Sequence, residues 1–372
     1  MKIDLRQVHK RITRLCQQHN VTYLATANPN HVLYLTGLSV HSPMDAFILI
    51  TPSWFILFSD NRYRGTIDAI ADRNPLIKSV VWNRLDLYTD VMKHVPQGAS
   101  VGFEGASVHS FYSYVLNFRK AAQARGVIAR NIKADIVGAV RMVKFPGEMA
   151  VLKRAFQVSD RAYEYVLPLL KPGVTELSVA QKLNAFMREQ SGSDEISFAT
   201  IIASGPHSAT PHATAGQRKL RKRDIITLDF GCVIENYRSD MTRTVFIGKP
   251  TALQQNIWET VFNAQQAAEH AASIGLTGND VDAVARQIIE DSGYGDFFNH
   301  STGHGVGVET HERPYITPSK VGKNVLEENQ VFTIEPGIYL PGQFGVRIEN
   351  TGVMTKRGFV SLCKSDMELT VL

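Results

Sequence analysis

Histidines are concentrated in one glycine-rich stretch of this 372-residue chain. The stretch HSTGHGVGVETHERP contains His300, His304 and His311, which are four and seven residues apart. Imidazole side chains bind metal ions and transfer protons near neutral pH, and the glycines between them let the backbone approach a ligand closely. One histidine alone would more often be structural, whereas three at this spacing predict partner residues elsewhere in the chain.

Carboxylates that could join these histidines lie upstream, in the segment IITLDFGCVIENYRSDMTRTVFIG. The segment contains two β-rich runs, and Glu235-Asn236 between them fits a two-residue hairpin turn. That turn would pair Asp229 with Thr242 and make Asp240 a diagonal neighbour of Asp229 on the same face, with backbones about 7–8 Å apart. Two carboxylates on an apolar hairpin repel each other, so we expect a pair of cations about 3.5–4 Å apart between them.

A second pair of β-rich runs, QVFTIEPGIYL and FGVRIENTGVM, follows the histidines. Each run carries one carboxylate, Glu335 or Glu349, and strand alternation places Arg347 on the same face as Glu349. Pro336-Gly337 ends the first run at its carboxylate. A lone glutamate in a strand is usually a salt-bridge partner, but four carboxylates and a histidine in two matching halves favour a metal site.

A weak internal repeat also indicates two halves. The segments GVTELSVAQKLNAFMREQSG and GLTGNDVDAVARQIIEDSG share Gly, Thr, Val and a closing Ser-Gly. Thr175 and Thr277 are placed to cap helices that end at glycine. Any two capped amphipathic helices look alike, so the repeat gains meaning only together with the paired carboxylates, with which it predicts internal pseudo-two-fold symmetry.

The pattern of the chain changes near residue 135. Before that point, short β-rich runs such as VTYLAT and WFILFSD alternate with helical patterns, which predicts an α/β domain over residues 1–134. From Pro146 a long helix begins, with apolar residues three and four positions apart. We therefore expect a second domain at residues 135–372.

The composition excludes several classes of protein. The net charge is +5, from 40 Lys and Arg against 35 Asp and Glu, and it is not concentrated in a basic tail. The basic run RKLRKRD fits a solvated turn before a strand, so we expect no nucleic-acid partner. The length exceeds what one hydrophobic core usually organises, which favours two domains.

The cysteines and the apolar runs indicate the compartment. Cys16, Cys232 and Cys363 are few and far apart, which predicts free thiols in a reducing compartment. The amino-terminal stretch is charged throughout and has the pattern of an amphipathic helix, not of a signal peptide. The most apolar run, residues 47–58, is too short to span a bilayer. We expect a cytoplasmic protein with no membrane partner.

Five motifs, taken in order, resemble those of a known family. LDFG, SDMTRT, STGHGVGVETHERP, IEPGIY and GVRIEN are similar to the motifs of the pita-bread metallopeptidases, the group of Xaa-Pro dipeptidases (prolidases), aminopeptidase P and methionine aminopeptidase. Upstream, FATIIASGPHSATPHA extends the match, and VLYLTG and FSDNRY resemble the creatinase-type N-terminal domain. The resemblance implies an α/β creatinase-like domain followed by an α+β pita-bread catalytic domain with internal pseudo-two-fold symmetry.

The resemblance also implies a dinuclear metal site. Its five ligands would be Asp229, Asp240, His304, Glu335 and Glu349. Four carboxylates balance two divalent cations, and an oxygen-rich set with one imidazole suits Mn, with Co and Zn as alternatives. Such ions lower the pKa of a bridging water enough to supply hydroxide near neutral pH and polarise the scissile carbonyl.

Further roles follow from the same resemblance. Glu335 matches the carboxylate that takes a proton from the attacking water, and His311 the residue that steadies the tetrahedral intermediate. The substrate-facing positions of the family are matched by His212, His300 and His311, and Arg347, two residues before Glu349, is expected to orient a ligand or to bind substrate. Tyr339 and Thr242 would support the ligands, and Arg313 is, on position alone, a candidate cation for a substrate carboxylate. Three histidines outside the motifs are expected to be structural: His9, His31 and His270.

The implied activity is that of a metal-dependent Xaa-Pro dipeptidase, acting as a homodimer on proline-containing dipeptides or short peptides. The compact first domain favours this activity over that of aminopeptidase P, which acts on longer peptides and tends to have a longer first domain. A pita-bread protein that only binds partners or nucleic acid is the remaining alternative. The complete set of five ligands argues against it.

Overall fold

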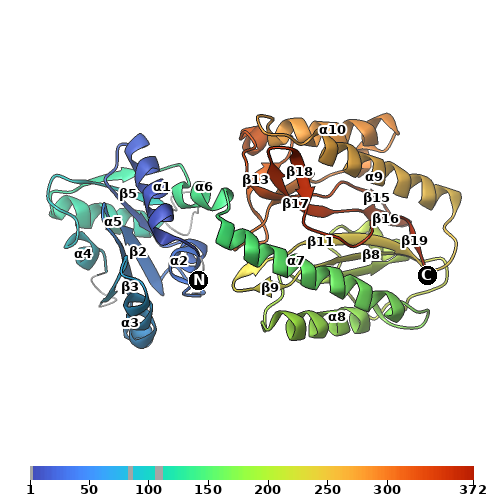
Figure 1. The fold of residues 1–372 in the computed structure, drawn as a ribbon, viewed down its shortest axis with the longest axis horizontal. Coiled ribbons are helices and arrows are strands. Elements are labelled where there is room, and N and C mark those ends of the chain that lie inside the picture. The colour runs from blue at the N-terminus through green and yellow to red at the C-terminus, as the bar shows by residue number, and fades with distance from the viewer. Residues whose placement is uncertain (1–2, 83–86, 105–111) are drawn as a thin grey trace. The chain divides into compact units, whose positions relative to one another are not determined.

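The structure is a computed structural model that describes residues 3–82, 87–104 and 112–372 (Figure 1). The chain forms two compact units, Met1–Arg141 and Met142–Leu372. The first unit ends within α6 (Ile136–Met142), a few residues after the boundary that the sequence predicts.

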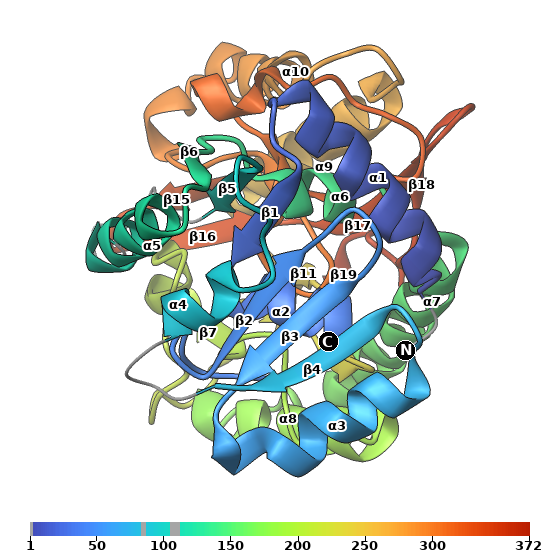
Figure 2. The same cartoon turned by 90° about the vertical axis from the view of Figure 1, so that its left-hand side faces the viewer.

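The first unit is an α/β domain whose elements can be followed in Figure 2. Within the described residues its sheet has the order β4-β3-β2-β1-β5-β6; β2 is antiparallel to β1 and β3, and the other neighbours are parallel. The strands are β1 (Tyr23–Thr26), β2 (Ala46–Ile50), β3 (Phe55–Ser59), β4 (Ile77–Val81), β5 (Ser100–Glu104) and β6 (Ile128–Asn131). The helices are α1 (Leu5–Gln18), α2 (Pro29–Thr36), α3 (Arg64–Arg73), α4 (Leu87–Met92), α5 (Tyr112–Ala124) and α6.

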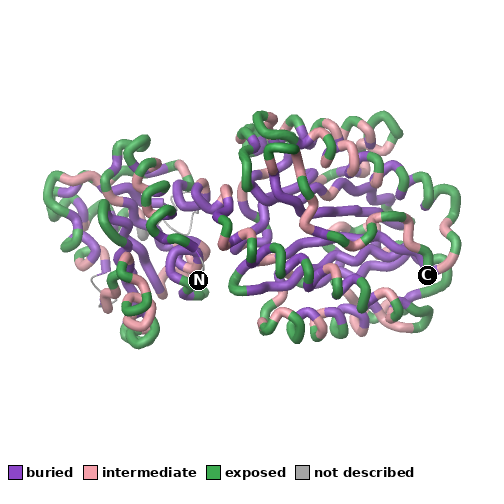
Figure 3. The backbone as a smooth tube through the Cα atoms, in the orientation of Figure 1, coloured by how far each residue is buried: buried purple, intermediate pink, exposed green. Residues whose placement is uncertain are grey.

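The core of this unit follows from two apolar strands. β2 reads AFILI and β3 reads FILFS, and all of their residues are buried (Figure 3), as expected for central strands covered on both faces. The ring centroid of Phe47 lies 6.2 Å from that of Phe58 and 6.1 Å from that of Phe103. The aromatic side chains therefore pack the space between the sheet and its helices.

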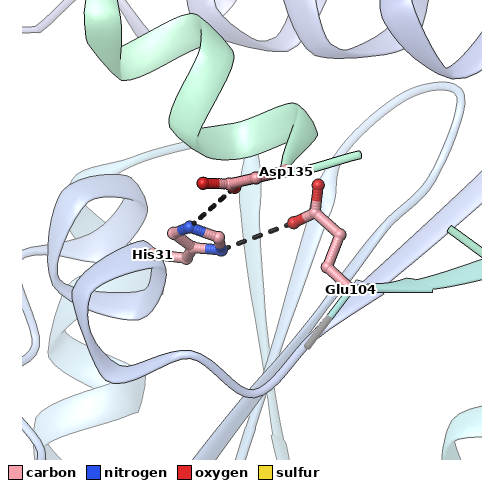
Figure 4. A group of neighbouring side chains, drawn as sticks. All are labelled: His31, Glu104 and Asp135. Carbon is pink, nitrogen blue, oxygen red and sulfur yellow. Dashed lines mark ion pairs between the residues drawn. The ribbon is translucent and has the colours of Figure 1, made fainter. Parts of the chain in front are cut away.

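His31 on α2 links two carboxylates inside the first unit (Figure 4). Its Nδ1 lies 3.4 Å from Glu104 Oε2, its Nε2 lies 3.3 Å from Asp135 Oδ1, and only 3% of the residue is exposed. The other oxygen of Glu104 accepts hydrogen bonds from the backbone N–H groups of Ile136 and Val137 at the start of α6. Because the carboxylates approach opposite edges of the ring, a doubly protonated imidazole pairs with both charges. One ligand atom of each of the three residues also lies within 4.8 Å of the other two, a spacing that a metal ion could use.

The second unit consists of two matching halves. α7 (Pro146–Val166) packs on α8 (Glu176–Ser191), α9 (Ala252–Ala271) packs on α10 (Gly278–Asp291), and Figure 1 shows strands between the two helix pairs. α7 is the long helix that the sequence predicts. The Oγ1 atoms of Thr175 and Thr277 accept hydrogen bonds from the first turns of α8 and α10, at 3.1 and 3.3 Å. The capped helices of the repeat are therefore confirmed.

The strands of the second unit form several sheets. In the described part of the chain, one sheet has the order β19-β11-β8-β7, another the order β13-β12-β14-β17-β18, and two short hairpins pair β9 with β10 and β15 with β16. The strands are β7 (Ile201–Ser204), β8 (Ile225–Phe230), β9 (Val233–Ile234), β10 (Tyr237–Arg238), β11 (Met241–Phe246), β12 (Gly303–Gly305), β13 (Glu312–Ile316), β14 (Val331–Ile334), β15 (Gly337–Leu340), β16 (Phe344–Arg347), β17 (Asn350–Thr355), β18 (Gly358–Ser361) and β19 (Thr370–Val371). β8, β11 and β14 are buried along their whole length.

The hairpin predicted over β8 to β11 is present. Its turn residues Glu235 and Asn236 have φ values of 47° and 71°, the conformation that two-residue hairpin turns require. The register pairs Asp229 with Thr242, as the position of the turn predicts. Asp240 directly precedes β11, so the backbone brings both aspartates to the same end of the strand pair.

The thiols and the helices can be compared with the sequence expectations. Cys16, Cys232 and Cys363 are all buried free thiols, as the sequence predicts. No helix among the residues that the structure describes is both long and apolar enough to cross a membrane.

The His31 network predicts a pH-dependent stability. Burial alone would lower the pKa of His31, but hydrogen bonding to Asp135 and Glu104 raises it above its ordinary value of 6.5. The stabilisation is therefore complete below pH 6.5 and is lost as the pH rises through the higher folded-state pKa. In urea unfolding at about pH 6, His31→Gln should lower the free energy of unfolding by about 3 kcal/mol. Between about pH 6 and about pH 9, the free energy of unfolding should fall less in this variant than in the wild type. Equal pH dependence of the two proteins would contradict the network.

Candidate metal centre

Five side chains from both halves of the second unit meet at one place. Carboxylate oxygens of Asp229, Asp240 and Glu349 lie within 4.8 Å of one another. His304 Nε2 lies 3.1 Å from Glu335 Oε1 and 3.7 Å from Asp240 Oδ2. The structure thus brings together all five residues that the sequence singles out as metal ligands.

The backbone fixes the two glutamates where strands end. Glu335 follows β14, and its N–H donates to the carbonyl of Thr302 at 2.7 Å. Glu349 lies between β16 and β17, and its N–H donates to the carbonyl of Thr242 at 3.1 Å. Thr242 belongs to the first hairpin, so the hydrogen bond from Glu349 joins the two halves, whereas that from Glu335 lies within the second half.

The acidic cluster lacks enough positive charge. Burial, and then repulsion by neighbouring carboxylates, raises the pKa values of Asp240 and Glu349 well above their ordinary values. Burial also raises the pKa of Asp229, although Arg347 opposes the shift. For Glu335 the effect of burial is outweighed by hydrogen bonding to His304, and its pKa falls to about 2. Of the four carboxylates, Asp240 and Glu349 therefore have the least compensation from the protein.

Two buried oxygen atoms support a cation at this site. Among the described residues, Asp229 Oδ1 and Glu349 Oε1 are buried and have no hydrogen-bond partner. Leaving a buried carboxylate oxygen unsatisfied is unfavourable unless an ion or a hydrogen bond compensates. An oxygen-rich donor set with one imidazole suits a divalent metal ion. The residues therefore fit a divalent metal centre.

Arg347 holds two of the proposed ligands, one directly and one through Thr242. It is 4% exposed, and its Nη2 donates to Asp229 Oδ2 at 2.6 Å and its Nη1 to Tyr339 Oη at 2.7 Å. Its Nε donates to Thr242 Oγ1 at 3.2 Å, and this hydroxyl donates to Glu349 Oε2 at 2.7 Å. Tyr339 and Thr242 thus lie where the resemblance predicts supporting residues. The guanidinium of Arg347, expected either to orient a ligand or to bind substrate, is largely engaged by protein groups, among them the proposed ligand Asp229.

A cavity of about 460 Å³ opens beside the acidic cluster, within the range of roughly 300–1,000 Å³ that small ligands occupy. Its wall contains the three substrate-facing histidines, His212, His300 and His311, together with His304 and Arg347. The rings of His304 and His311 lie 4.2 Å apart between centroids. The predicted substrate residues therefore share one cavity.

The wall also contains residues that the sequence did not single out. Its apolar part includes Phe198, Ile201, Pro211 and Ala213, and Tyr315 lies opposite His304 in the β12–β13 pairing. An aromatic residue just after HERP, in a short β-rich run, is a signal that could have identified Tyr315. Arg313 is absent from the part of the wall that the structure describes, so its position places no guanidinium there.

Comparisons with known proteins agree with this geometry. Residues 150–356 match the family described as Metallopeptidase family M24. The chain is 33% identical over 362 residues to the Xaa-Pro dipeptidase of Pyrococcus furiosus, which covers 97% of this chain and 98% of that protein. Among solved structures, it resembles the Xaa-Pro dipeptidase from Bacillus anthracis with a TM-score of 0.87 at 31% identity, covering 99% and 100% of the two chains. The X-Pro aminopeptidase from Thermotoga maritima gives a TM-score of 0.85 at 32% identity, covering 98% and 99%.

The unbalanced carboxylates predict how metal removal changes stability. The raised pKa values of Asp240 and Glu349 mean that protonation of these groups stabilises the folded protein. This stabilisation is complete below the ordinary pKa values of 3.8 and 4.5 and is lost as the pH rises through the higher folded-state values. The chelated protein should therefore lose thermal stability as the pH is raised above about 5, and added Mn²⁺ should remove most of this loss. Thermal unfolding with EDTA or Mn²⁺ measures both profiles. Identical profiles would contradict a metal centre at these residues.

Proposed function

This chain belongs to metallopeptidase family M24, and we propose that it is a metal-dependent Xaa-Pro dipeptidase, which hydrolyses the peptide bond before proline. The convergence of four carboxylates and one histidine beside a cavity is the observation that carries the proposal. The family and the expected fold, a creatinase-like α/β domain followed by an α+β pita-bread domain, are confirmed. The homodimer and the cytoplasmic location expected from the sequence remain predictions.

Members of this family use divalent metal ions, and we propose that this chain binds two of them. The ligands would be Asp229, Asp240, His304, Glu335 and Glu349, with Mn as the first choice and Co or Zn as alternatives. When bound, such ions lower the pKa of a coordinated water and polarise the scissile carbonyl. The unpartnered oxygens of Asp229 and Glu349 support this assignment.

Glu335 and His311 are the proposed catalytic residues. Glu335 is partly exposed to the cavity, unlike the buried Glu349, so its carboxylate can accept a proton from an attacking water. Burial, followed by the charge of His304, lowers the pKa of His311 to about 4. A neutral imidazole retains one N–H, with which His311 can stabilise the oxyanion that forms at the carbonyl.

The cavity suits a proline residue. Proline lacks a backbone N–H, so the bond before it needs no hydrogen-bond acceptor on that side of the site. The apolar wall at Phe198, Ile201 and Ala213 offers contact to a pyrrolidine ring. His212 and His300 lie in the same wall, where they can orient the polar groups of the peptide.

Aminopeptidase P activity is the second candidate, because two observations favour it. The X-Pro aminopeptidase from Thermotoga maritima resembles the chain almost as well as the dipeptidases do. The nitrogens of Arg347 already bond to protein groups, and Arg313 does not line the described part of the cavity. A dipeptide would therefore have to place its free carboxylate against the histidines.

Asp240→Asn should abolish Xaa-Pro hydrolysis without unfolding the protein. The change removes one negative charge and one metal-binding oxygen while the side chain keeps its shape. We expect kcat/KM to fall by at least about 100-fold, the upper range for changes that only support a metal ligand. Proline release measures activity, circular dichroism measures folding, and Asp296→Asn, an exposed aspartate outside the site, is the matched control. Full activity of Asp240→Asn would refute the site.

Substrate length separates the two candidate functions. A dipeptidase should prefer Xaa-Pro over Xaa-Pro-Yaa by about 10-fold in kcat/KM, which corresponds to roughly one hydrogen bond to a charged group. The corresponding Xaa-Pro amide distinguishes the effect of charge from that of length. Measuring all three substrates with Mn²⁺, Co²⁺ and Zn²⁺ also identifies the preferred metal. Preference for the tripeptide would replace the dipeptidase proposal with aminopeptidase P.

A further inference from the structure

The capped helices of the repeat each carry a buried carboxylate that contacts a histidine-bearing segment. We propose that Asp282 on α10 is a positioning residue for the metal-binding segment 300–304, and that Glu176 on α8 is a positioning residue for the substrate-facing segment 204–216. The inference rests on the proposed function for the roles of His304 and His212. The inference gives the two repeated helices a role in positioning the site, in addition to the five proposed ligands.

Asp282 is bonded to the middle of its segment. It is 1% exposed, and its Oδ1 accepts hydrogen bonds from the backbone N–H of Thr302 at 3.2 Å and from the Thr302 hydroxyl at 2.8 Å. Thr302 lies between the substrate-side His300 and the metal ligand His304. A shift of this carboxylate would therefore move both histidines.

Arg286 completes the attachment of the same segment. It lies one helical turn after Asp282, and its Nε and Nη2 donate to the two carboxylate oxygens at 2.8 and 3.0 Å. Its Nη1 donates to the carbonyl of Phe298 and its Nη2 to the carbonyl of His300, each at 3.0 Å. The ion pair is thus satisfied internally and also fixes the backbone that leads into the site.

Glu176 binds both ends of the other segment. It is fully buried, and its Oε1 accepts hydrogen bonds from the backbone N–H of Ser204 at 2.8 Å and from the Ser204 hydroxyl at 2.6 Å. Its Oε2 lies 2.8 Å from His207 Nδ1 and accepts a longer hydrogen bond, 3.4 Å, from the N–H of Gly216. Between these contacts the segment supplies His212 to the cavity wall.

The two attachments have the same chemistry. Each helix carboxylate accepts both the N–H and the hydroxyl hydrogen of one Ser or Thr, and that residue directly precedes a glycine, Gly205 or Gly303. A Cβ at Gly303 would lie 2.0 Å from the carbonyl oxygen of Thr333, so the segment approaches β14 too closely for a side chain to pack there. The carboxylate of the neighbouring helix adds a second support to the hydrogen bonds that already join the segment to its neighbours, such as that from the N–H of Glu335 to the carbonyl of Thr302.

The two carboxylates should differ in what they control. Residues that orient a metal ligand typically contribute about 10- to 100-fold to metal affinity or activity. Asp282 acts on the segment that contains His304, so its removal should weaken metal binding. Glu176 contacts no metal ligand in the hydrogen bonds of the described residues, and none of the residues that its segment places in the cavity wall is a proposed metal ligand. Its removal should change turnover of the peptide and leave metal binding unaffected.

The experiment compares matched variants of the full-length protein. At the attachment of segment 300–304, Asp282→Asn removes the accepting carboxylate and Thr302→Val removes the donating hydroxyl. At the attachment of segment 204–216, Glu176→Gln and Ser204→Ala remove the corresponding groups. Asp280→Asn, which changes the capping box of α10, and Glu189→Gln, an exposed position of α8, are the controls. Calorimetry on metal-stripped protein gives the Kd for Mn²⁺, and steady-state assays at saturating Mn²⁺ give kcat and KM for an Xaa-Pro dipeptide.

We expect Asp282→Asn to raise the Kd for Mn²⁺ by about 10-fold or more, and Thr302→Val to change it in the same direction. Glu176→Gln and Ser204→Ala should leave this Kd within about twofold and lower kcat/KM at saturating Mn²⁺ by about 10-fold. The controls should change neither quantity. If Asp282→Asn or Glu176→Gln fails to fold, the matching hydroxyl variant, Thr302→Val or Ser204→Ala, tests the same attachment.

Two results would overturn the proposal. One is an equal effect of Asp282→Asn and Asp280→Asn on the Kd for Mn²⁺; the other is a loss of Mn²⁺ binding in Glu176→Gln as large as in Asp282→Asn. A wild-type protein that binds Mn²⁺ but hydrolyses no Xaa-Pro peptide would instead contradict the proposed function. In that case the Kd for Mn²⁺ would still test whether Asp282 positions the metal-binding segment.

Discussion

The charge balance of one buried acidic cluster governs the second unit. Of its four carboxylates, Glu335 is paired with His304 and Asp229 with Arg347. Among the described residues, Asp240 has only His304, which is 3.7 Å away and is already paired with Glu335, and Glu349 has no cationic partner. Their raised pKa values express this deficit, since burial and mutual repulsion both favour the protonated form. Divalent cations would remove the deficit without protonation, which is why the fold and the metal chemistry depend on each other.

The first unit shows the contrasting case. There, His31 lies between Glu104 and Asp135 with one ring nitrogen directed at each carboxylate, so the doubly protonated ring pairs with both. In the second unit a single imidazole faces four carboxylates, and its Nδ1 lies 3.1 Å from the backbone carbonyl of Gly305, so that only Nε2 is directed at the acidic groups. Clusters of histidine and carboxylate that look similar in composition therefore differ in charge balance, because the number and direction of the charges differ.

A metal centre of this kind needs rigid support, since carboxylates that repel each other would otherwise separate. Arg347 donates a hydrogen bond to the ligand Asp229 and the Thr242 hydroxyl donates one to Glu349, while Tyr339 accepts a hydrogen bond from Arg347. Asp282 and Glu176 fix the histidine-bearing segments from the helices. Hydrogen bonds thus link the site to strands of both halves and to one helix of each half, which makes its geometry a property of the whole unit.

The sequence by itself determined what depends on neighbours along the chain. The Glu235-Asn236 turn fixes the register of the hairpin and hence the pairing of Asp229, and the order of the motifs identifies the family and its five acidic and imidazole groups. Only the tertiary structure decided that Arg347 bonds to Asp229, 118 residues away, and that Tyr315 lines the cavity. Turn position and strand alternation are local rules, whereas contacts between distant segments arise when apolar faces of whole elements pack together. No spacing within a single motif encodes that packing.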